Sequence, residues 1–207
     1  MMGQSTVERV TDQIVAVVLA AGRSSRMGRA KQLEVVAGTP MVVQATQTAL
    51  ASAVGRVIVI TGAYAPEVTV ILAPLCEAAG DRLRLVHNAA WATGQASSVR
   101  TAIAALPASC QAALFLPTDQ PFVPVGLLNE LIATWLTGAR IAAPSVEGQP
   151  RGAPAIFDRE LWPELLALEG DTGARPLLQR YQAELVTVPA DAYWLRDIDT
   201  PADLLKV

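Results

Sequence analysis

The chain has 207 residues, 52% of them hydrophobic and 17% charged, and its 16 basic and 19 acidic side chains give a formal net charge of -3. A chain of this length buries enough surface to fold without disulfides or a structural metal, and we expect one domain over residues 1–207. Two cysteines and one histidine are too few for a zinc site. The slightly acidic balance argues against nucleic-acid binding, and no apolar run reaches the ~18 residues of a membrane span. We expect a cytoplasmic protein.

Short apolar runs alternate with longer amphipathic stretches, which is typical of a mostly parallel sheet covered by helices. Four strands are predicted, at residues 14–20, 56–61, 83–87 and 112–117. The first is apolar throughout, as expected of a central strand that is covered on both faces. Residues before Thr11 are predicted to form an untethered tail.

Two helices are predicted before the third strand. Thr39-Pro40 is a hydroxyl cap followed by proline at the first helical position, and Gly55 is expected to end that helix. The next helix is expected over residues 66–80, with Pro74 kinking or interrupting it. Both helices would cover the sheet between consecutive parallel strands.

Two more helices are predicted around the fourth strand. One begins with Ser97 or Ser98 as its cap and runs to Leu106. The other covers residues 124–137 and is closed by Gly138.

The pattern loosens after Ala143, and a mixed extension of the sheet is predicted there. The expected features, in order, are a turn at 147–152, an apolar run at 153–157, helices at 158–168 and 173–181, a strand at 184–188 and a helix opened by Thr200-Pro201.

The loop after the first strand is the most informative segment. Small residues let a backbone approach a ligand, exposed N–H groups form an anion nest, and basic side chains add charge, so the loop is predicted to bind phosphates. Its spacing fits neither a P-loop nor a dinucleotide fingerprint. An ordinary glycine-rich loop is the alternative, but Lys31 is one of only two lysines in the chain. The predicted nucleotide-binding residues here are Leu19, Ala20, Ala21, Gly22, Arg23, Ser24, Ser25, Arg26 and Lys31.

The segment LAAGRSSRMGRAK, starting at Leu19, resembles the signature LAAGxSxRMGxxK of MobA-like nucleotidyltransferases. Similar segments follow in the same order at residues 88–98, 119–121, 170–175 and 197–201. The resemblance implies a Rossmann-like three-layer α/β fold with a mostly parallel, mixed central sheet. Within the superfamily the chain is most similar to molybdenum cofactor cytidylyltransferases. These join CMP from CTP to the terminal phosphate of molybdopterin and release pyrophosphate.

By this resemblance, residues 11–145 form the nucleotide-binding half and residues 146–207 the acceptor-binding half. Arg26 and Lys31 would hold the β- and γ-phosphates and neutralise charge on the leaving pyrophosphate. Asp119 follows the fourth strand at its carboxyl end and is the expected Mg²⁺ ligand. These three residues form the predicted catalytic set.

A second metal ligand is expected from Asp197 or Asp199, which alternate along an expected strand and could face one ion. The resemblance favours Asp197, but either carboxylate could instead cap the helix opened by Thr200-Pro201.

The segment from Asn88 to Ser98 is expected to select the nucleoside. Asn88, Gly94, Ser97 and Ser98 are the predicted contacts, whereas Trp91 is more simply interpreted as a packing anchor.

Acceptor contacts are expected from Arg151 and Arg175, with Asp171 capping the helix that follows it. Gly152-Ala153-Pro154 departs from the family's Gly-His-Pro or Gly-Asn-Pro element, and Thr118 replaces a common glycine.

Leu19-Ala20-Ala21-Gly22 resembles the cytidine-using branch, which favours CTP over GTP. The expected partners are CTP, molybdopterin and an apo-molybdoenzyme, with no nucleic acid and no membrane. Three alternatives stay open: a molybdopterin guanylyltransferase, a sugar- or alditol-phosphate nucleotidyltransferase, and a non-catalytic accessory protein that binds the molybdenum cofactor.

Overall fold

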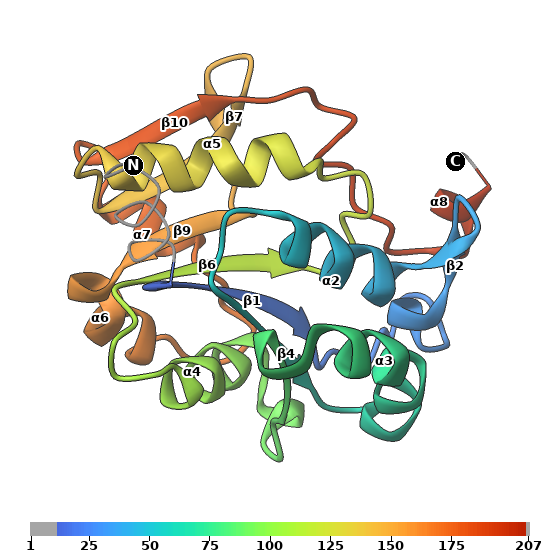
Figure 1. The fold of residues 1–207 in the computed structure, drawn as a ribbon. Coiled ribbons are helices and arrows are strands. Elements are labelled where there is room, and N and C mark those ends of the chain that lie inside the picture. The colour runs from blue at the N-terminus through green and yellow to red at the C-terminus, as the bar shows by residue number, and fades with distance from the viewer. Residues whose placement is uncertain (1–11, 206–207) are drawn as a thin grey trace, which may run out of the picture.

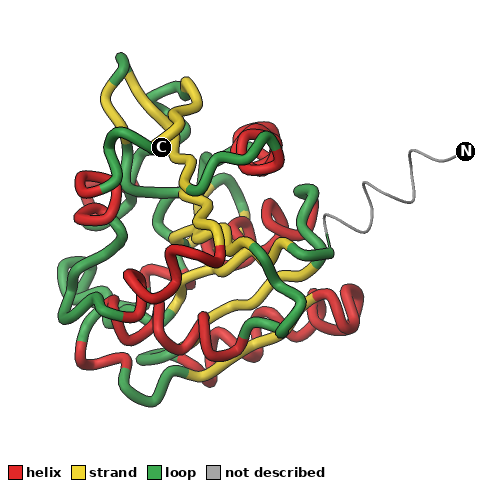
Figure 2. Tube along the Cα trace, turned by 90° about the vertical axis from the view of Figure 1, so that its left-hand side faces the viewer, coloured by secondary structure: helices red, strands yellow, loops and turns green. Residues whose placement is uncertain are grey.

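A computed structural model describes residues 12–205, in which a central sheet of eight strands lies between two layers of helices (Figures 1 and 2). The strand order is β10-β7-β9-β6-β1-β4-β5, with β8 paired to β7. Within the described residues, β9 pairs antiparallel with β6 and β7, β8 pairs antiparallel with β7, and the other strand pairs of this sheet are parallel. The strands are β1 (Ile14–Ala20), β4 (Arg56–Thr61), β5 (Leu83–His87), β6 (Ala112–Pro117), β7 (Ile141–Val146), β8 (Gln149–Pro150), β9 (Ala155–Asp158) and β10 (Leu185–Pro189). The predicted α/β class and mixed sheet are confirmed.

Helices cover both faces of the sheet (Figure 1). Helices α2, α3 and α5 contribute to one buried cluster, and α4, α6 and α7 contribute to the other. Among the described residues, no helix is long and apolar enough to cross a membrane. The helices are α2 (Met41–Ala51), α3 (Ala65–Ala79), α4 (Gln95–Ala105), α5 (Val125–Leu136), α6 (Trp162–Leu166), α7 (Arg175–Arg180) and α8 (Pro201–Leu204).

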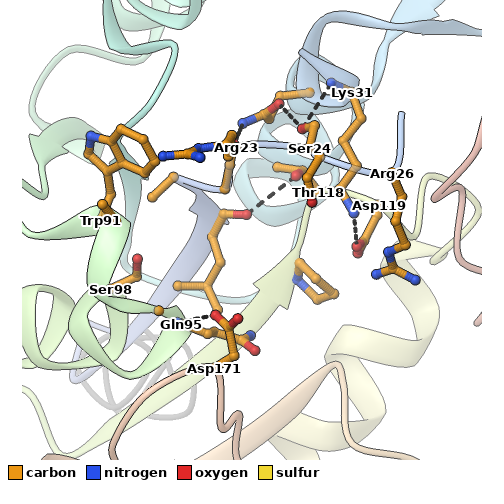
Figure 3. A pocket seen from close by; sticks show the side chains of 18 residues that line it. Arg23, Ser24, Arg26, Lys31, Trp91, Gln95, Ser98, Thr118, Asp119 and Asp171 are labelled. Carbon is orange, nitrogen blue, oxygen red and sulfur yellow. Dashed lines mark hydrogen bonds and ion pairs between the residues drawn. The ribbon is translucent and has the colours of Figure 1, made fainter. Parts of the chain in front are cut away.

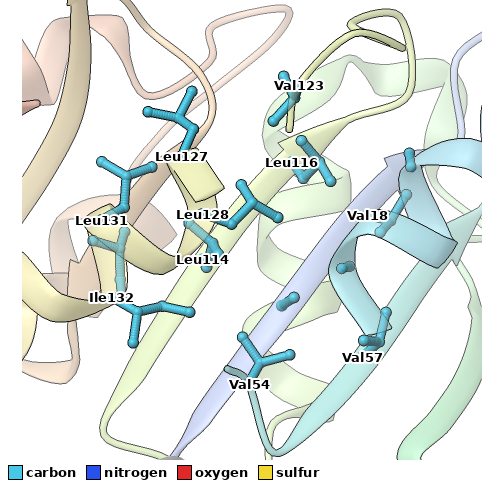
Figure 4. Close-up of a cluster of buried hydrophobic side chains, with 14 of the residues drawn as sticks. Val18, Val54, Val57, Leu114, Leu116, Val123, Leu127, Leu128, Leu131 and Ile132 are labelled. Carbon is cyan, nitrogen blue, oxygen red and sulfur yellow. The ribbon is translucent and has the colours of Figure 1, made fainter. Parts of the chain in front are cut away.

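Strand β1 shows why this arrangement is stable. Ile14, Ala16 and Val18 face the first cluster, whereas Val15 and Val17 face the second, as the period of two along a strand requires. All five are fully buried, and burying a large aliphatic side chain contributes about 1.5–3 kcal/mol. Figure 4 shows Val18 among the leucines that β6 and α5 contribute to the first cluster.

The parallel strands β1, β4 and β6 end at the same edge of the sheet. The loop after β1, the turn after β4 and residues 118–120 after β6 therefore come together there. Ligands of open α/β sheets bind at this carboxyl edge.

Two predicted helix starts are wrong. Thr39 and Pro40 form β3, which pairs with β2 (Val35–Val36), and α2 begins one residue later without a side-chain cap. Helix α4 begins at Gln95, because Gly94 is its N-cap at φ 106°, and Ser97 lies inside the first turn. Tertiary contacts of the chain before each helix, rather than a local hydroxyl, determine where these helices begin.

Other boundaries also differ from expectation. Helix α2 ends at Ala51 rather than Gly55, and α3 continues through Pro74 without interruption. The predicted helices at 158–168 and 173–181 are shorter: α6 follows a 3-10 turn, and α7 spans six residues. The predicted N-terminal tail lies outside the described residues.

Candidate active site

A cavity of about 600 Å³ opens at the carboxyl edge of β1 and β6 (Figure 3). It is lined by eleven of the predicted site residues, which come from the loop after β1, the start of α4 and the end of β6. These are Leu19, Ala21, Gly22, Arg23, Ser24, Ser25, Arg26, Lys31, Gly94, Ser98 and Asp119. The predicted phosphate loop, nucleoside segment and metal ligand thus share one cavity.

Lys31 lies between two carboxylates. Its Nζ donates to Asp119 Oδ2 at 2.6 Å and to Asp199 Oδ1 at 2.7 Å. Burial lowers the pKa of Lys31, but attraction to Asp119 and Asp199 outweighs it, so the pKa is raised and the ammonium stays charged. Arg26 pairs with Asp199 at 2.8 Å, but its side chain is 71% exposed, so this pair stabilises the fold little.

Asp197 points to a different neighbour. Its Oδ1 accepts a hydrogen bond from Gln120 Nε2 at 3.0 Å. Burial, and then the charge of Asp119, raise the pKa of Asp197. The strand predicted at residues 197–199 is wrong, because this segment is irregular and its Ile198 N donates to Asp119 O.

Neither Asp197 nor Asp199 caps the last helix. The Asp203 carboxylate accepts from both the backbone N–H and the hydroxyl of Thr200, closing a capping box at α8. The carboxylates of Asp197 and Asp199 therefore have no capping role.

The residues present fit a divalent ion only together with substrate. Across residues 12–205, no group of three His, Cys, Asp or Glu side chains could hold a metal by itself. Mg²⁺ is usually held by one or two carboxylates plus phosphate oxygens and water. Asp119, with Asp199 or Asp197, supplies that number of carboxylates beside the phosphate loop.

We expect Asp197→Asn to raise the free energy of unfolding at pH 7 in the presence of EDTA. The folded-state pKa of Asp197 lies above its ordinary 3.8, so ionisation costs stability as pH rises through that pKa. The gain should shrink as the pH is lowered through the folded-state pKa, because the Asp197 carboxyl of the folded wild type then becomes neutral, as asparagine is. Urea unfolding across this pH range measures the gain in stability. If Asp197→Asn were no more stable than wild type at pH 7, the raised pKa of Asp197 would be contradicted.

The nucleoside segment is arranged around Asn88, which is 1% exposed. Its Nδ2 donates to Ser97 Oγ at 2.8 Å and to Ser98 Oγ at 3.1 Å. Of these three residues, only Ser98 lines the cavity. Asn88 and Ser97 therefore support Ser98 from behind the cavity wall.

Trp91 also lines this cavity, with the Arg23 guanidinium 5.3 Å from its ring centroid (Figure 3). It packs against the second buried cluster as well, so the expectation of a packing anchor is consistent with its position.

Asp171 caps a helix other than the one expected. Its Oδ1 accepts from the backbone N–H of Gln95, the first residue of α4, at 3.3 Å, whereas α7 has no side-chain cap. The neighbouring Gly170 carbonyl accepts from Ala96 N at 3.0 Å. The segment from Gly170 thus holds the first turn of α4 against the cavity.

A second cavity of about 660 Å³ adjoins the first. Asp119, Gln95 and Pro117 line both cavities. The two arginines expected to contact the acceptor, Arg151 and Arg175, line the second one. Asp119 thus stands where the two cavities meet.

Four predicted site residues lie outside both cavities, and several residues that the sequence does not single out as contacts line the first one. Ala20 is 1% exposed and faces the first buried cluster, and Asn88, Ser97 and Asp199 do not line either cavity. Gln32, Gln95, Thr118 and Asp171 line the first cavity although none was predicted to contact the nucleotide. Gln32 directly follows Lys31 in the sequence but lies outside the motif that ends there.

These features define a nucleotidyltransferase, and comparison with known proteins identifies the group. The family model described as the MobA-like NTP transferase domain matches residues 16–185, so the chain belongs to that family. Purine catabolism protein PucB of Bacillus subtilis is 31% identical over 194 residues, covering 92% of this chain and 93% of PucB.

Solved structures agree with this assignment. Rv0371c of Mycobacterium tuberculosis is 27% identical with a TM-score of 0.77, covering 95% of this chain and 97% of that one. It has also been solved in complex with manganese. A nucleotidyl transferase from Methanothermobacter thermautotrophicus is 26% identical with a TM-score of 0.73, covering 94% of this chain and 95% of that one. The resemblance seen in the sequence is confirmed at the level of the superfamily.

Proposed function

We propose that the protein transfers CMP from CTP to the terminal phosphate of molybdopterin and releases pyrophosphate, with Mg²⁺ as cofactor. The observation that carries the proposal is the pair of adjoining cavities that share Asp119. One contains the basic loop around Arg26 and Lys31, and the other contains Arg151 and Arg175. Two anionic substrates bound in them would meet beside a carboxylate, which suits phosphoryl transfer between them.

The reaction needs positioning and charge neutralisation. An oxygen of the acceptor phosphate attacks the α-phosphorus of CTP, and the bond from that phosphorus to the pyrophosphate oxygen breaks. Arg26 and Lys31 would donate to the oxygens of the leaving pyrophosphate. Arg151 and Arg175 would hold the acceptor's anionic groups in the second cavity.

A divalent ion would be held by Asp119 with Asp199 or Asp197, and when bound it would neutralise charge on the phosphates. The manganese complex of Rv0371c supports this part of the proposal. The preference for CTP rests on Leu19-Ala20-Ala21-Gly22, since related guanylyltransferases carry LAGG at that turn.

The second cavity suits an acceptor that combines a polar ring system with a phosphate. Gln120, Gln149, Gln179 and Gln182 line it together with the two arginines. Primary amides both donate and accept, so they can pair with the donors and acceptors of a pterin ring, and also with the hydroxyls of the sugar or alditol alternative.

The test is pyrophosphate release from CTP and from GTP, with Mg²⁺, with and without purified molybdopterin. Release from CTP that requires molybdopterin is the expected result. Release from GTP instead would favour the guanylyltransferase alternative.

Folded protein that releases no pyrophosphate with either nucleotide would overturn the molybdopterin proposal. A panel of sugar and alditol phosphates would then test the second alternative. Absence of nucleotide binding by calorimetry would leave the accessory-protein alternative.

A further inference from the structure

Gln32 is a buried amide whose side-chain nitrogen and oxygen both form hydrogen bonds to the loop after β1. It is 1% exposed. Its Nε2 donates to the carbonyl of Ala20 at 3.0 Å and to that of Gly22 at 2.7 Å, and its Oε1 accepts from Ser24 Oγ at 3.0 Å. A fully satisfied buried polar group rigidifies the segments that it joins. One side chain therefore ties together three positions within a five-residue turn.

These hydrogen bonds determine where the peptide groups point. The C=O and N–H of a trans peptide point in opposite directions, so turning the Gly22 carbonyl toward Gln32 turns the Arg23 N–H away from it. Within residues 12–205, no protein group accepts from the backbone N–H groups of residues 23 to 26. Successive free N–H groups of this kind form an anion nest.

Ser24 is the second element of this arrangement. It has φ 59°, in the left-handed region that residues other than glycine rarely adopt. Its hydroxyl donates to Gln32 and accepts from the backbone N–H of Lys31 at 3.1 Å. Ser24 is a predicted nucleotide-binding residue, but its hydroxyl is engaged inside the loop, where it links the turn with positive φ to the segment that carries Lys31.

We propose that Gln32 is a positioning residue for the nucleotide: through Ala20, Gly22 and Ser24 it presets the loop so that the N–H groups of residues 23–26 meet the triphosphate. Gln32 acts on the loop and not on the reacting atoms. The inference rests on the proposed function only in that the loop binds a nucleoside triphosphate; it does not depend on the base or the acceptor.

The test compares Gln32→Glu with wild type. The glutamate has the same size, but its carboxylate cannot donate to the two carbonyls and repels them. We expect KM for the nucleotide, and its Kd by calorimetry with Mg²⁺, to rise about tenfold or more. KM for the acceptor should change less than twofold.

Ser24→Ala should shift the nucleotide KM in the same direction. The two substitutions together should raise it by less than the product of their separate effects, because they break the same link.

Thr46→Val is the matched control, since Thr46 is fully buried in α2 and its hydroxyl donates to Val42 O at 2.7 Å, away from both cavities. If Gln32 served stability alone, Gln32→Glu would behave like Thr46→Val. Both variants would have a lower folded fraction, and the KM values for nucleotide and acceptor would be unchanged. Unchanged nucleotide KM and Kd in folded Gln32→Glu would overturn the inference.

The nucleotide used is whichever of CTP and GTP the wild-type protein binds. Binding of GTP alone would overturn the proposed base preference while leaving this test intact. Failure of folded wild type to bind either would overturn both proposals.

Discussion

Asp119→Asn should lower turnover by about 10²- to 10³-fold or more while the protein stays folded. Asp119 lines both cavities, and its Oδ2 accepts from Lys31 Nζ at 2.6 Å. Asparagine keeps the size of the side chain but removes one of the two carboxylate charges that hold Lys31, and with it the charge that a divalent ion would need. Single-turnover pyrophosphate release measures the loss, and thermal unfolding checks the fold.

Asp191→Asn is the control for this substitution. Asp191 is exposed, lines neither cavity, and accepts from the backbone N–H of Tyr193 at 2.8 Å, so its replacement should leave turnover near wild type. If Asp119→Asn retained full activity, Asp119 would not be the residue at which the two substrates meet. A protein that only carries cofactor would be indifferent to both substitutions.

The central strands could be predicted from the sequence because both of their faces are buried. Strand β1 needs an apolar residue at every position, and such a run is visible without knowing its neighbours. The starts of α2 and α4 could not be predicted in the same way. Gly94 begins α4 because the segment at Gly170, far along the chain, packs against it and supplies the carbonyl and carboxylate that accept from the first turn.

The residues of the candidate site also differ in how far the sequence predicts them. Arg26, Lys31 and Asp119 belong to motifs with a recognisable order, and the structure brings them to one cavity. Gln32 carries no such signal, because a buried amide is recognised only by the carbonyls that it meets after folding. Asp171 does cap a helix, but a local pattern assigns it to the helix next in sequence instead of the one next in space.

Gly94→Ala should be the most damaging substitution of a glycine near the site. A Cβ at this position would lie 2.3 Å from the backbone carbon and oxygen of Gly170 and 2.7 Å from Asp171 N, and the φ of 106° disfavours any side chain. Backbone atoms cannot move aside as a flexible side chain can, so we expect a loss of about 3 kcal/mol or more. For a protein of this size that lowers the midpoint of thermal unfolding by about 6–12 °C.

Gly126→Ala is the control, because Gly126 lies in α5 and has no positive φ. Beyond its chain neighbours and the backbone of its own helix, no atom would lie within 4 Å of the new Cβ. Gly126→Ala should leave the protein as stable as wild type or more stable by up to about 1 kcal/mol.

In Gly94→Ala protein that still folds, displacement of the Gly170 segment should also raise the nucleotide KM, because Asp171 and Ser98 form the cavity wall at this point. Wild-type stability with wild-type KM in Gly94→Ala would mean that α4 and the Gly170 segment are not in the contact described.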